Sequence, residues 1–480
     1  MAVDTRSKAY NEMLAKWQLP LALLGGTNTM REQSSIWLPK MPDEDEQVYN
    51  LRVKRSFLFN VYSRTIESMV GNAFSSNITL SNIPDKLQYL EWNATGSGES
   101  LTEVAAKLFR DSLIFGKCHS YVDFPDTEID RVSQVEYDQM GLRPYIARIS
   151  PISLIGWDLE YNNGFENINH VRLVDEMVLL NDNFEEEYYE VIRVVYRDRI
   201  VTYKRPKGLT QAATGKQWEE AATIPNTLGY VPLQTGYANK TGTFTANPTL
   251  EDLAWLNLQH FQSSSDQSNI LHIARVPILL GVGFNEKDSE SVTLAANQMI
   301  ITDNKDATIK YVEHTGQAIA AGRQHGKDIE EQMHRAGAEI LFSQSVARQT
   351  ATARKVDQQQ ALSVSQQSLR SIEQMLEQAF YVAADWLDYE EPFEPTVNIG
   401  ADLDLADDPN PINSFIELSK YFGLSPEAAL EDAKRRGLLA KHITLKDIDI
   451  LERETLPTAS NADVVPPNLN NEPDEDREDQ

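Results

Sequence analysis

Hydrophobic residues recur at steps of three, four and seven in residues 338–391, a stretch without glycine or proline. The positions are Leu362, Leu369, Ile372, Leu376, Ala379, Ala383 and Trp386. This spacing lays one apolar stripe along a helix and predicts a helix over residues 350–389. Its other side is rich in glutamine and serine: Gln358, Gln359, Gln360, Ser363, Gln366, Gln367, Ser371 and Gln374. Such a side suits either protein neighbours or a plain polar surface.

A second amphipathic helix is predicted just upstream, over residues 317–341. Its apolar positions are Ile329, Met333, Ala336 and Ile340. Between the two helices, residues 342–349 are poorly patterned, small and polar, so we expect a loop there. A continuous helix, or a simple helical hairpin in a bundle, is the alternative interpretation.

Other helices are predicted from apolar periodicity and from end signals. They cover residues 4–17, 46–74 (long and mostly buried), 101–115, 412–422, 426–436 and 444–454. Gly116 is expected to end the helix before it. Another helix is expected over 247–272, with Asn247 as its cap and Pro248 in its first turn.

Short β-branched and aromatic runs predict antiparallel strands in the middle of the chain. They lie at 118–124, 144–149, 154–159, 170–178, 188–195 and 200–204, and loops are expected over 206–247. Further short strands, at 276–282, 292–294, 298–301 and 308–312, predict a small β module between two long helices.

The composition is that of a large acidic protein, with 480 residues, 41% hydrophobic content and a net charge of −28. This charge disfavours tight binding to nucleic-acid phosphates, yet it suits a wall past which a polyanion slides. No apolar run reaches the ~18 residues of a membrane span, and no signal peptide is seen. The single cysteine, Cys118, excludes an internal disulfide and cysteine-based zinc sites.

Motifs for catalysis fail when their spacing is tested. Gly326-Lys327 lacks the glycine five residues earlier and the Ser/Thr afterwards that a phosphate-binding loop needs; Ala321 and Asp328 stand there. Cys118 and His119 are neighbours in a predicted strand, so their side chains point to opposite faces. We therefore expect no catalytic site, no cofactor and no metal centre.

The acidic run Asp402, Asp404, Asp407 and Asp408 lacks the glycine turn and terminal glutamate of a calcium loop. From residue 457 onward the chain is proline, asparagine and acid without periodicity, so a disordered tail is predicted.

The order of elements resembles the portal proteins, or head-to-tail connectors, of tailed bacteriophages, within a portal-like subfamily once catalogued as a domain of unknown function. The segments that carry the resemblance are LLGGTNTMR (23–31), YNLRVKRS (49–56), LFNVY (58–62), PTLEDLA (248–254), NLQH (257–260), SSD (264–266), ARVPI (274–278) and QTATAR (349–354). They spread over most of the chain, and none is catalytic.

The resemblance implies an α+β fold of the portal type. Its parts would be the wing (1–246), stem helix 1 (247–272), a β-rich clip (273–315), stem helix 2 (316–341), a tunnel loop (342–349), a long kinked wing helix (350–394), a helical crown (395–456) and the disordered tail (457–480).

It also implies a ring, usually a dodecamer, at one capsid vertex of the virion, assembled in the host cytoplasm. Double-stranded DNA would be packaged and ejected through its channel. The implied partners are the large terminase subunit, then the tail adaptor, and also the major capsid protein and scaffold; no membrane is implied.

The candidate site residues follow from these parts. The tunnel loop Ser343, Gln344, Ser345, Val346, Ala347, Arg348 and Gln349 would line the channel, and Glu286, Lys287 and Asp288 would lie on the clip where partners dock. Arg348 is expected to contact DNA phosphates; the alternative is that it pairs with Glu339 or Asp357 of a neighbouring subunit.

Two other classes remain as hypotheses. A non-portal structural or scaffold protein of the virion would explain the glutamine-rich helix but not the β modules. A hydrolytic enzyme would need convergent titratable groups, which the sequence does not supply.

Overall fold

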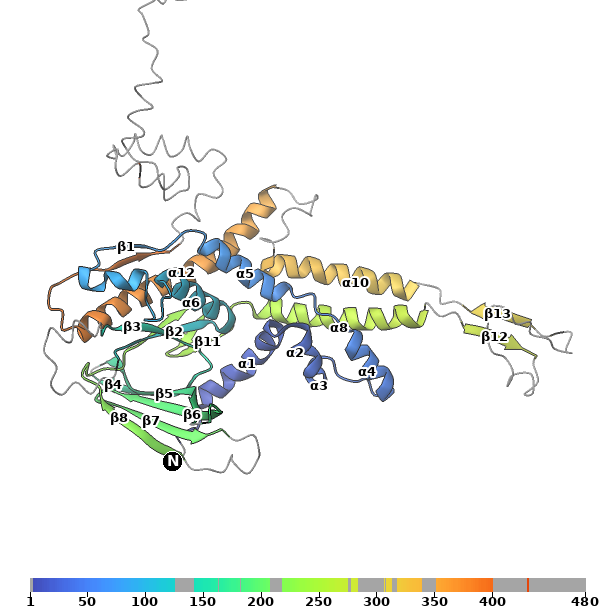
Figure 1. Cartoon of the computed structure of the whole chain (residues 1–480). Coiled ribbons are helices and arrows are strands. Elements are labelled where there is room, and N and C mark those ends of the chain that lie inside the picture. The colour runs from blue at the N-terminus through green and yellow to red at the C-terminus, as the bar shows by residue number, and fades with distance from the viewer. Residues whose placement is uncertain are drawn as a thin grey trace, which may run out of the picture. The chain divides into compact units, whose positions relative to one another are not determined.

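In the computed structural model the chain divides into two compact units, Met1–Ala401 and Asp402–Gln480. The structure describes residues 3–125, 142–162, 164–181, 183–207, 218–274, 278–283, 306, 308–312, 317–338, 351–399 and 430. Apart from residue 430, the predicted crown helices, acidic run and tail lie outside this description. Helices and antiparallel strands make up the first unit (Figure 1), which confirms the α+β class.

The amino-terminal part of the first unit is mainly helical. Its helices are α1 (Lys8–Leu24), α2 (Gly26–Glu32), α3 (Ser34–Trp37), α4 (Glu46–Arg55), α5 (Val61–Ala73), η1 (Asp85–Glu91) and α6 (Leu101–Phe115). The predicted helix over 4–17 begins later, because the Ser7 hydroxyl caps it at the Tyr10 amide. It also continues through Pro20, since burial of Trp17 and Leu23 on its inner side holds the last turns in place.

The predicted helix over 46–74 is two helices, so that prediction was wrong. The Arg31 guanidinium holds the Ser56 carbonyl at 2.6 and 3.0 Å, and the Asn60 side chain caps α5 at the Ser63 amide. The expected burial holds for α5 but not for α4. The only buried side chain of α4 is Arg52, at 4% exposure.

A tight turn at Gly116 joins α6 to β2, the middle strand of the first sheet. As predicted, α6 ends at Gly116, which has φ 78°, and β2 (Lys117–Asp123) follows at once. A Cβ atom on Gly116 would lie 1.8 Å from the Asn247 carbonyl oxygen, so only glycine fits. β2 is the middle of a three-stranded antiparallel sheet with β3 (Tyr145–Ile149) and β9 (Leu233–Tyr237).

A second sheet is a five-stranded antiparallel meander. Its strands are β4 (Leu154–Asn162), β5 (Phe165–Leu180), β6 (Glu186–Tyr196), β7 (Arg199–Pro206) and β8 (Glu219–Pro225). Val171, Leu173 and Val195 pack in its core with residues of the first sheet. The predicted strands are confirmed here, but β5 and β6 run beyond the core to the turn that joins them.

Residues 206–247 are more than the predicted loops, since they include β8, β9, β10 (Lys240–Gly242) and β11 (Thr245–Ala246). β9 reads LQTGY and lacks a β-branched run; pairing with β2 makes it a strand. Asn247 does not cap the next helix either. Its side-chain oxygen accepts a hydrogen bond from Lys16 at 2.7 Å, and the helix starts at Glu251.

The predicted helix over 350–389 is confirmed as α12 (Ala351–Trp386), which packs on β2, β9 and α6. Its stripe residues Leu369, Ile372, Leu376, Ala379 and Ala383 are buried, while the side chain of Leu362 lies outside the described part. β14 (Thr396–Asn398) pairs with β1 (Thr79–Ser81). No helix in the described residues is long and apolar enough to cross a membrane.

Candidate functional site

Two long helices, α8 (Glu251–Ala274) and α10 (Gln317–Met333), lie side by side, and a β pair follows at their far end (Figure 1). The Gln267 amide donates to the Ile319 carbonyl at 2.9 Å, and His260 Nε2 lies 3.3 Å from Glu330 Oε1. Since later residues of α8 meet earlier residues of α10, the helices are antiparallel. They occupy the positions predicted for the two stem helices, and we call this pair the stem.

The stem helices approach closely. The Gln267 side-chain oxygen lies 2.1 Å from where a Cβ atom of residue 322 would be, so this side chain packs directly against Gly322. Ile329 and Met333, two of the predicted apolar positions on α10, are buried. Close contact over several turns makes the pair one packed unit.

Polar side chains attach the stem to the amino-terminal helices. Buried Asn257 of α8 accepts a hydrogen bond from the Tyr62 amide at 2.9 Å and donates to the Phe59 carbonyl at 3.0 Å. Further along α8, Asp266 lies 3.3 Å from the Arg52 guanidinium of α4. These contacts fix α8 relative to α4 and α5.

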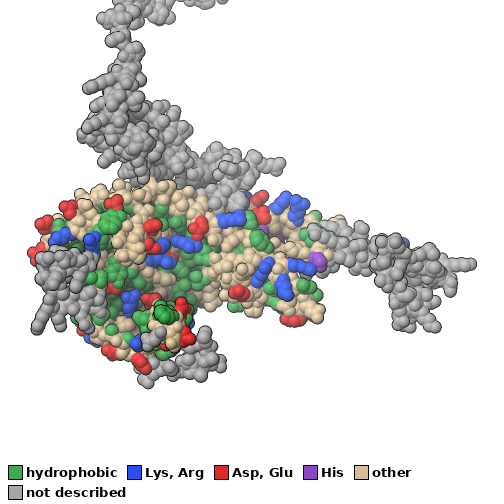
Figure 2. Space-filling view, in the orientation of Figure 1, with side chains coloured by type: hydrophobic (Ala, Val, Ile, Leu, Met, Phe, Trp, Pro, Cys, Tyr) green, Lys and Arg blue, Asp and Glu red, His purple; other side chains and the backbone are tan. Residues whose placement is uncertain are grey.

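One side of the stem remains uncovered in the single chain. Trp255 and Ile270 of α8 are exposed, and Trp255 lines a shallow hollow of about 560 Å³ with Gln259 and Gln262. Lysine and arginine side chains stand among acidic ones on the face of this region seen in Figure 2. A mixed surface with an exposed tryptophan is typical of a face that packs against another protein.

The β pair beyond the stem consists of β12 (Ile278–Val282) and β13 (Thr308–Val312), joined antiparallel with Ile278 opposite Val312. Both strands were predicted, and they lie within the segment 273–315 that was predicted to be the clip. The three docking residues Glu286, Lys287 and Asp288 lie outside the described residues, as do the strands predicted at 292–294 and 298–301. Their role therefore stays a prediction.

The carboxyl end of α10 leaves regular helical geometry. A π-type segment, η2 (His334–Ala338), follows it, and Gly337 has φ 131°, a conformation that favours glycine. The regular α-helix thus ends earlier than the predicted residue 341. The tunnel-loop residues, Ser343 through Arg348 to Gln349, lie outside the described residues.

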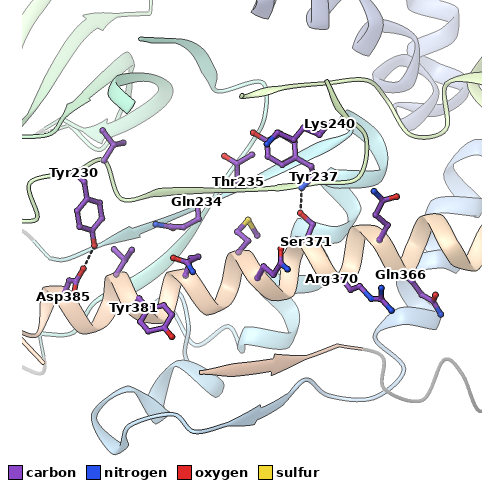
Figure 3. Close-up of a pocket in the computed structure, with 16 residues that line it drawn as sticks. Tyr230, Gln234, Thr235, Tyr237, Lys240, Gln366, Arg370, Ser371, Tyr381 and Asp385 are labelled. Atoms are coloured by element: carbon purple, nitrogen blue, oxygen red, sulfur yellow. Dashed lines mark hydrogen bonds between the residues drawn. The ribbon is translucent and has the colours of Figure 1, made fainter. Parts of the chain in front are cut away.

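A groove of about 1060 Å³ lies between α12 and the β9 segment (Figure 3). One wall is the glutamine-rich side of α12, including Gln366, Gln367, Gln374 and Gln378. The other wall includes Gln234 and Thr235 of β9. The sequence indicated the first wall through its unusual glutamine content, but it missed the second because β9 was not recognised.

Direct hydrogen bonds hold the two walls together. The Ser371 hydroxyl accepts from the Tyr237 amide at 2.8 Å, and the Tyr230 hydroxyl donates to Asp385 at 2.5 Å (Figure 3). Burial, and then the bond to Asp385, raises the pKa of Tyr230, so its hydroxyl stays protonated at neutral pH. The groove offers amide donors and acceptors, which suits a polar protein surface.

The adjacent residues Lys117, Cys118 and His119 of β2 are buried and do not form a reactive group. Cys118 Sγ faces the Gly236 carbonyl at 3.7 Å, whereas His119 Nδ1 lies 2.8 Å from the Thr235 hydroxyl. Burial raises the pKa of the Cys118 thiol and lowers the pKa of the His119 ring well below its ordinary value. Both groups are therefore neutral in the core at pH 7.

Lys117 is a buried amine without a carboxylate partner among the described residues. Its Nζ donates to the Phe244 carbonyl at 2.7 Å and lies 5.5 Å from the ring centres of both Trp17 and Trp157. Burial lowers the pKa of Lys117 to about 7. The amine fastens β2 to α1 and β4 through these aromatic contacts.

Among the described residues, no group of three His, Cys, Asp or Glu side chains is arranged to hold a metal ion. His260 has one carboxylate neighbour, Glu330, which comes from the partner helix and not from the residues near it in sequence. A single His–Glu contact provides two of the several ligands that a metal site needs.

Residues 249–387 match a family described as a domain of unknown function (DUF4055). The match begins at the stem and ends with α12, and it covers less than half of the chain. No curated protein matches the chain.

Among solved structures, the chain is similar to one described as the neck of a native GTA particle computed with C12 symmetry. Identity is 11% and the TM-score is 0.38, with 80% of this chain and 90% of that chain covered. A second, the neck of an empty GTA particle computed with C6 symmetry, has 10% identity and a TM-score of 0.38, with 78% and 89% covered.

Proposed function

We propose that this chain is a structural subunit of a phage-type head–tail connection and, within that class, the portal protein. Copies of the chain would form a ring at one vertex of the capsid, and double-stranded DNA would pass through the central channel during packaging and ejection. In this proposal the protein binds and positions partners and is not an enzyme.

The observation that carries the proposal is the antiparallel stem of α8 and α10, which extends from an α+β body and carries the β12–β13 pair at its end. After η2 and residues 339–350, the chain returns to the body as the 36-residue helix α12. The sequence resemblance predicts this order as stem, clip, tunnel loop and wing helix, and the order of the described helices and strands supports the proposal.

The exposed surfaces agree with packing between copies. Trp255 and Ile270 of the stem are uncovered in the single chain, and the α12 groove presents glutamine amides. A ring of stems would cover the apolar residues. The chain's net charge of −28 would make much of the assembly repel DNA, so that a duplex slides and is not retained.

The finer roles belong to the same proposal. The clip, 273–315, would dock the large terminase subunit and later the tail adaptor. The segment 342–349 would line the channel, with Arg348 from each subunit forming a collar of positive charge. The parts beyond residue 395 would face the capsid interior, near the major capsid protein and scaffold.

Negative-stain imaging combined with native mass measurement tests the proposal. We expect a closed cyclic oligomer of around a dozen subunits with a central hole wide enough for a duplex. A monomer that persists at high protein concentration would contradict it, and an elongated dimer would favour a scaffold protein instead.

A further inference from the structure

The hairpin of β5 and β6 ends in an apolar tip that no described part of the chain covers. Four consecutive residues of β5, from Met177 to Leu180, are all exposed, and Leu180 is 67% exposed. Consecutive residues of a strand point to opposite faces, so both faces of the tip are apolar and open. An uncovered two-sided apolar tip is unusual on an isolated soluble protein.

The turn of this hairpin holds a phenylalanine outward. The Asn181 side-chain oxygen accepts from the amides of Asn183 and Glu185, both at 2.9 Å, and the Phe184 amide donates to the Asn181 carbonyl at 3.0 Å. Phe184 has φ 64° and is 87% exposed. A left-handed backbone conformation is strained for a residue other than glycine. The hydrogen bonds of the turn thus keep Phe184 in a strained backbone conformation with its apolar side chain exposed to solvent.

Acidic residues border this tip. Glu185, Glu186 and Glu187 are exposed, and no cation within the described residues pairs with them. In Figure 2 hydrophobic side chains bordered by acidic ones lie at the lower edge of the body, over the sheet. We call residues 177–181 and 183–188 the hairpin tip: an apolar projection with a negative border.

The surface of α4 has the complementary character. Val48 and Leu51, three residues apart on one side of the helix, are 41% and 48% exposed, and Phe57 just beyond is 65% exposed. Lys54 and Arg55 are exposed beside them and have no acidic partner in the part of the chain described. We call this set the α4 surface: an apolar face with a positive border at its carboxyl end.

We infer that the hairpin tip of one copy docks on the α4 surface of a neighbouring copy. The two surfaces match in apolar content and have opposite charge, while copies of a chain with a net charge of −28 otherwise repel one another. Because the two surfaces differ, each copy offers its tip to one neighbour and its α4 surface to the other, and such head-to-tail contacts form a ring when the rotation between copies closes. The inference rests on the proposed ring and names the contact that builds it.

Engineered cysteines test which residues meet. The variant carrying Phe184→Cys and Leu51→Cys should give covalent multimers on oxidation, and a mixture of the two single variants should give covalent dimers only. Native Cys118 is buried and does not compete. Trp92→Cys with Leu51→Cys is the matched control, since Trp92 is 62% exposed elsewhere, and it should stay uncrosslinked.

A disulfide formed within one chain, or assembled rings whose engineered cysteines do not cross-link, would overturn the inferred contact. If the unmodified protein forms no rings, the proposed function fails. Covalent dimers from the mixture of the two single-cysteine variants would still establish the contact between copies, so the two failures are distinguishable.

Charge reversal provides a second, independent test. E185K/E186K/E187K and, separately, K54E/R55E should each raise the protein concentration at half-assembly by about tenfold or more, because like charges then face each other. The combined variant restores opposite charges and should return to within about threefold of the original. Rings that form normally from both separate variants would overturn the inference and leave the ring itself standing.

Discussion

The guanidinium of Arg52 and the carboxylate of Glu44 form a two-point ion pair, with N–O distances of 2.7 and 2.8 Å, inside the contact between α4 and α8. The same guanidinium donates to the Pro39 carbonyl at 3.1 Å and lies 3.3 Å from Asp266 of α8. One buried cation of α4 thus contacts both the stem, at Asp266, and the segment that precedes the helix, at Glu44 and Pro39.

Replacing Arg52 with alanine should detach α4. It leaves Glu44 buried without its partner, and breaking a buried ion pair costs about 3 to 5 kcal/mol. Hydrogen exchange of the α4 amides should rise sharply. Arg110→Ala is the control, because its pair with Glu67 is at the surface and is worth under ~1 kcal/mol. Unchanged exchange in α4 would contradict this assignment.

The same pair predicts an acid dependence. Hydrogen bonds from Arg52 lower the pKa of Glu44 from its ordinary 4.5. A carboxylate whose pKa is lowered in the folded state contributes stability that is complete above its unfolded-state pKa. That stability is lost as the pH falls through the folded-state pKa. Protection of the α4 amides should thus fall on acidification below about pH 4.5, and it should fall less in Arg52→Ala.

Lys117 predicts that stability rises with pH above neutrality. Burial lowers the pKa of Lys117 to about 7 from 10.5, so between these values the unfolded chain binds the extra proton. Folding stability should therefore increase with pH there, by up to roughly 1.4 kcal/mol per pH unit. Urea unfolding at pH 7.5 and 9.5 measures it, and Lys117→Met should remove that increment. An equal rise in the variant would show that other groups cause it.

Alanine substitutions at Gly116 and Gly229 distinguish the cost of a steric clash from the cost of a left-handed backbone. Both have positive φ, 78° and 74°, but a Cβ at Gly116 would meet the Asn247 carbonyl at 1.8 Å, whereas nothing lies within 4 Å at Gly229. Gly229→Ala should cost about 1 to 2 kcal/mol for the left-handed backbone. Gly116→Ala should cost several times more, because α6, β2 and the start of the stem must separate. Equal losses in thermal unfolding would contradict the packing argument.

Arg348→Ala tests the proposed channel. If Arg348 contacts DNA, rings should form normally while packaged DNA is lost early in a salt-dependent manner. If it pairs instead with Glu339 or Asp357 of a neighbouring subunit, the rings themselves should be less stable. Normal packaging and DNA retention at every salt concentration would exclude the DNA contact.

Charge reversal at Glu286, Lys287 and Asp288 tests the proposed clip. Rings should still assemble, because the stem is untouched, while binding of the terminase and the adaptor should weaken. Binding assays on purified rings measure this. Undiminished binding of both partners would place the docking surface elsewhere.

Sequence reasoning succeeded where burial within the chain follows directly from periodicity. Ile329 and Met333 on α10, and Leu369, Ile372 and Leu376 on α12, were predicted as inner positions and are buried. It failed at α4, because the spacing of Val48 and Leu51 shows that a face is apolar but not which molecule covers it.

The remaining errors have tertiary causes. β9 is a strand because it pairs with β2, and the propensities of its own residues do not predict that pairing. Asn247 is a residue type that often caps a helix, but its side-chain oxygen accepts a hydrogen bond from Lys16, which is distant in sequence. The groove on α12 was only half predictable, because the glutamines were visible and their facing wall was not.

The length of α12 has a mechanical consequence. A helix of 36 residues is about 54 Å long, so a load applied at Ala351 would be transmitted along it. The bonds at Ser371 and Asp385 attach that helix to the β9 segment, which pairs with β2. A force applied to α12 near residues 342–349 would therefore reach the central sheet. The turn at Gly116 is closely packed against Asn247, so the sheet has little room to move there.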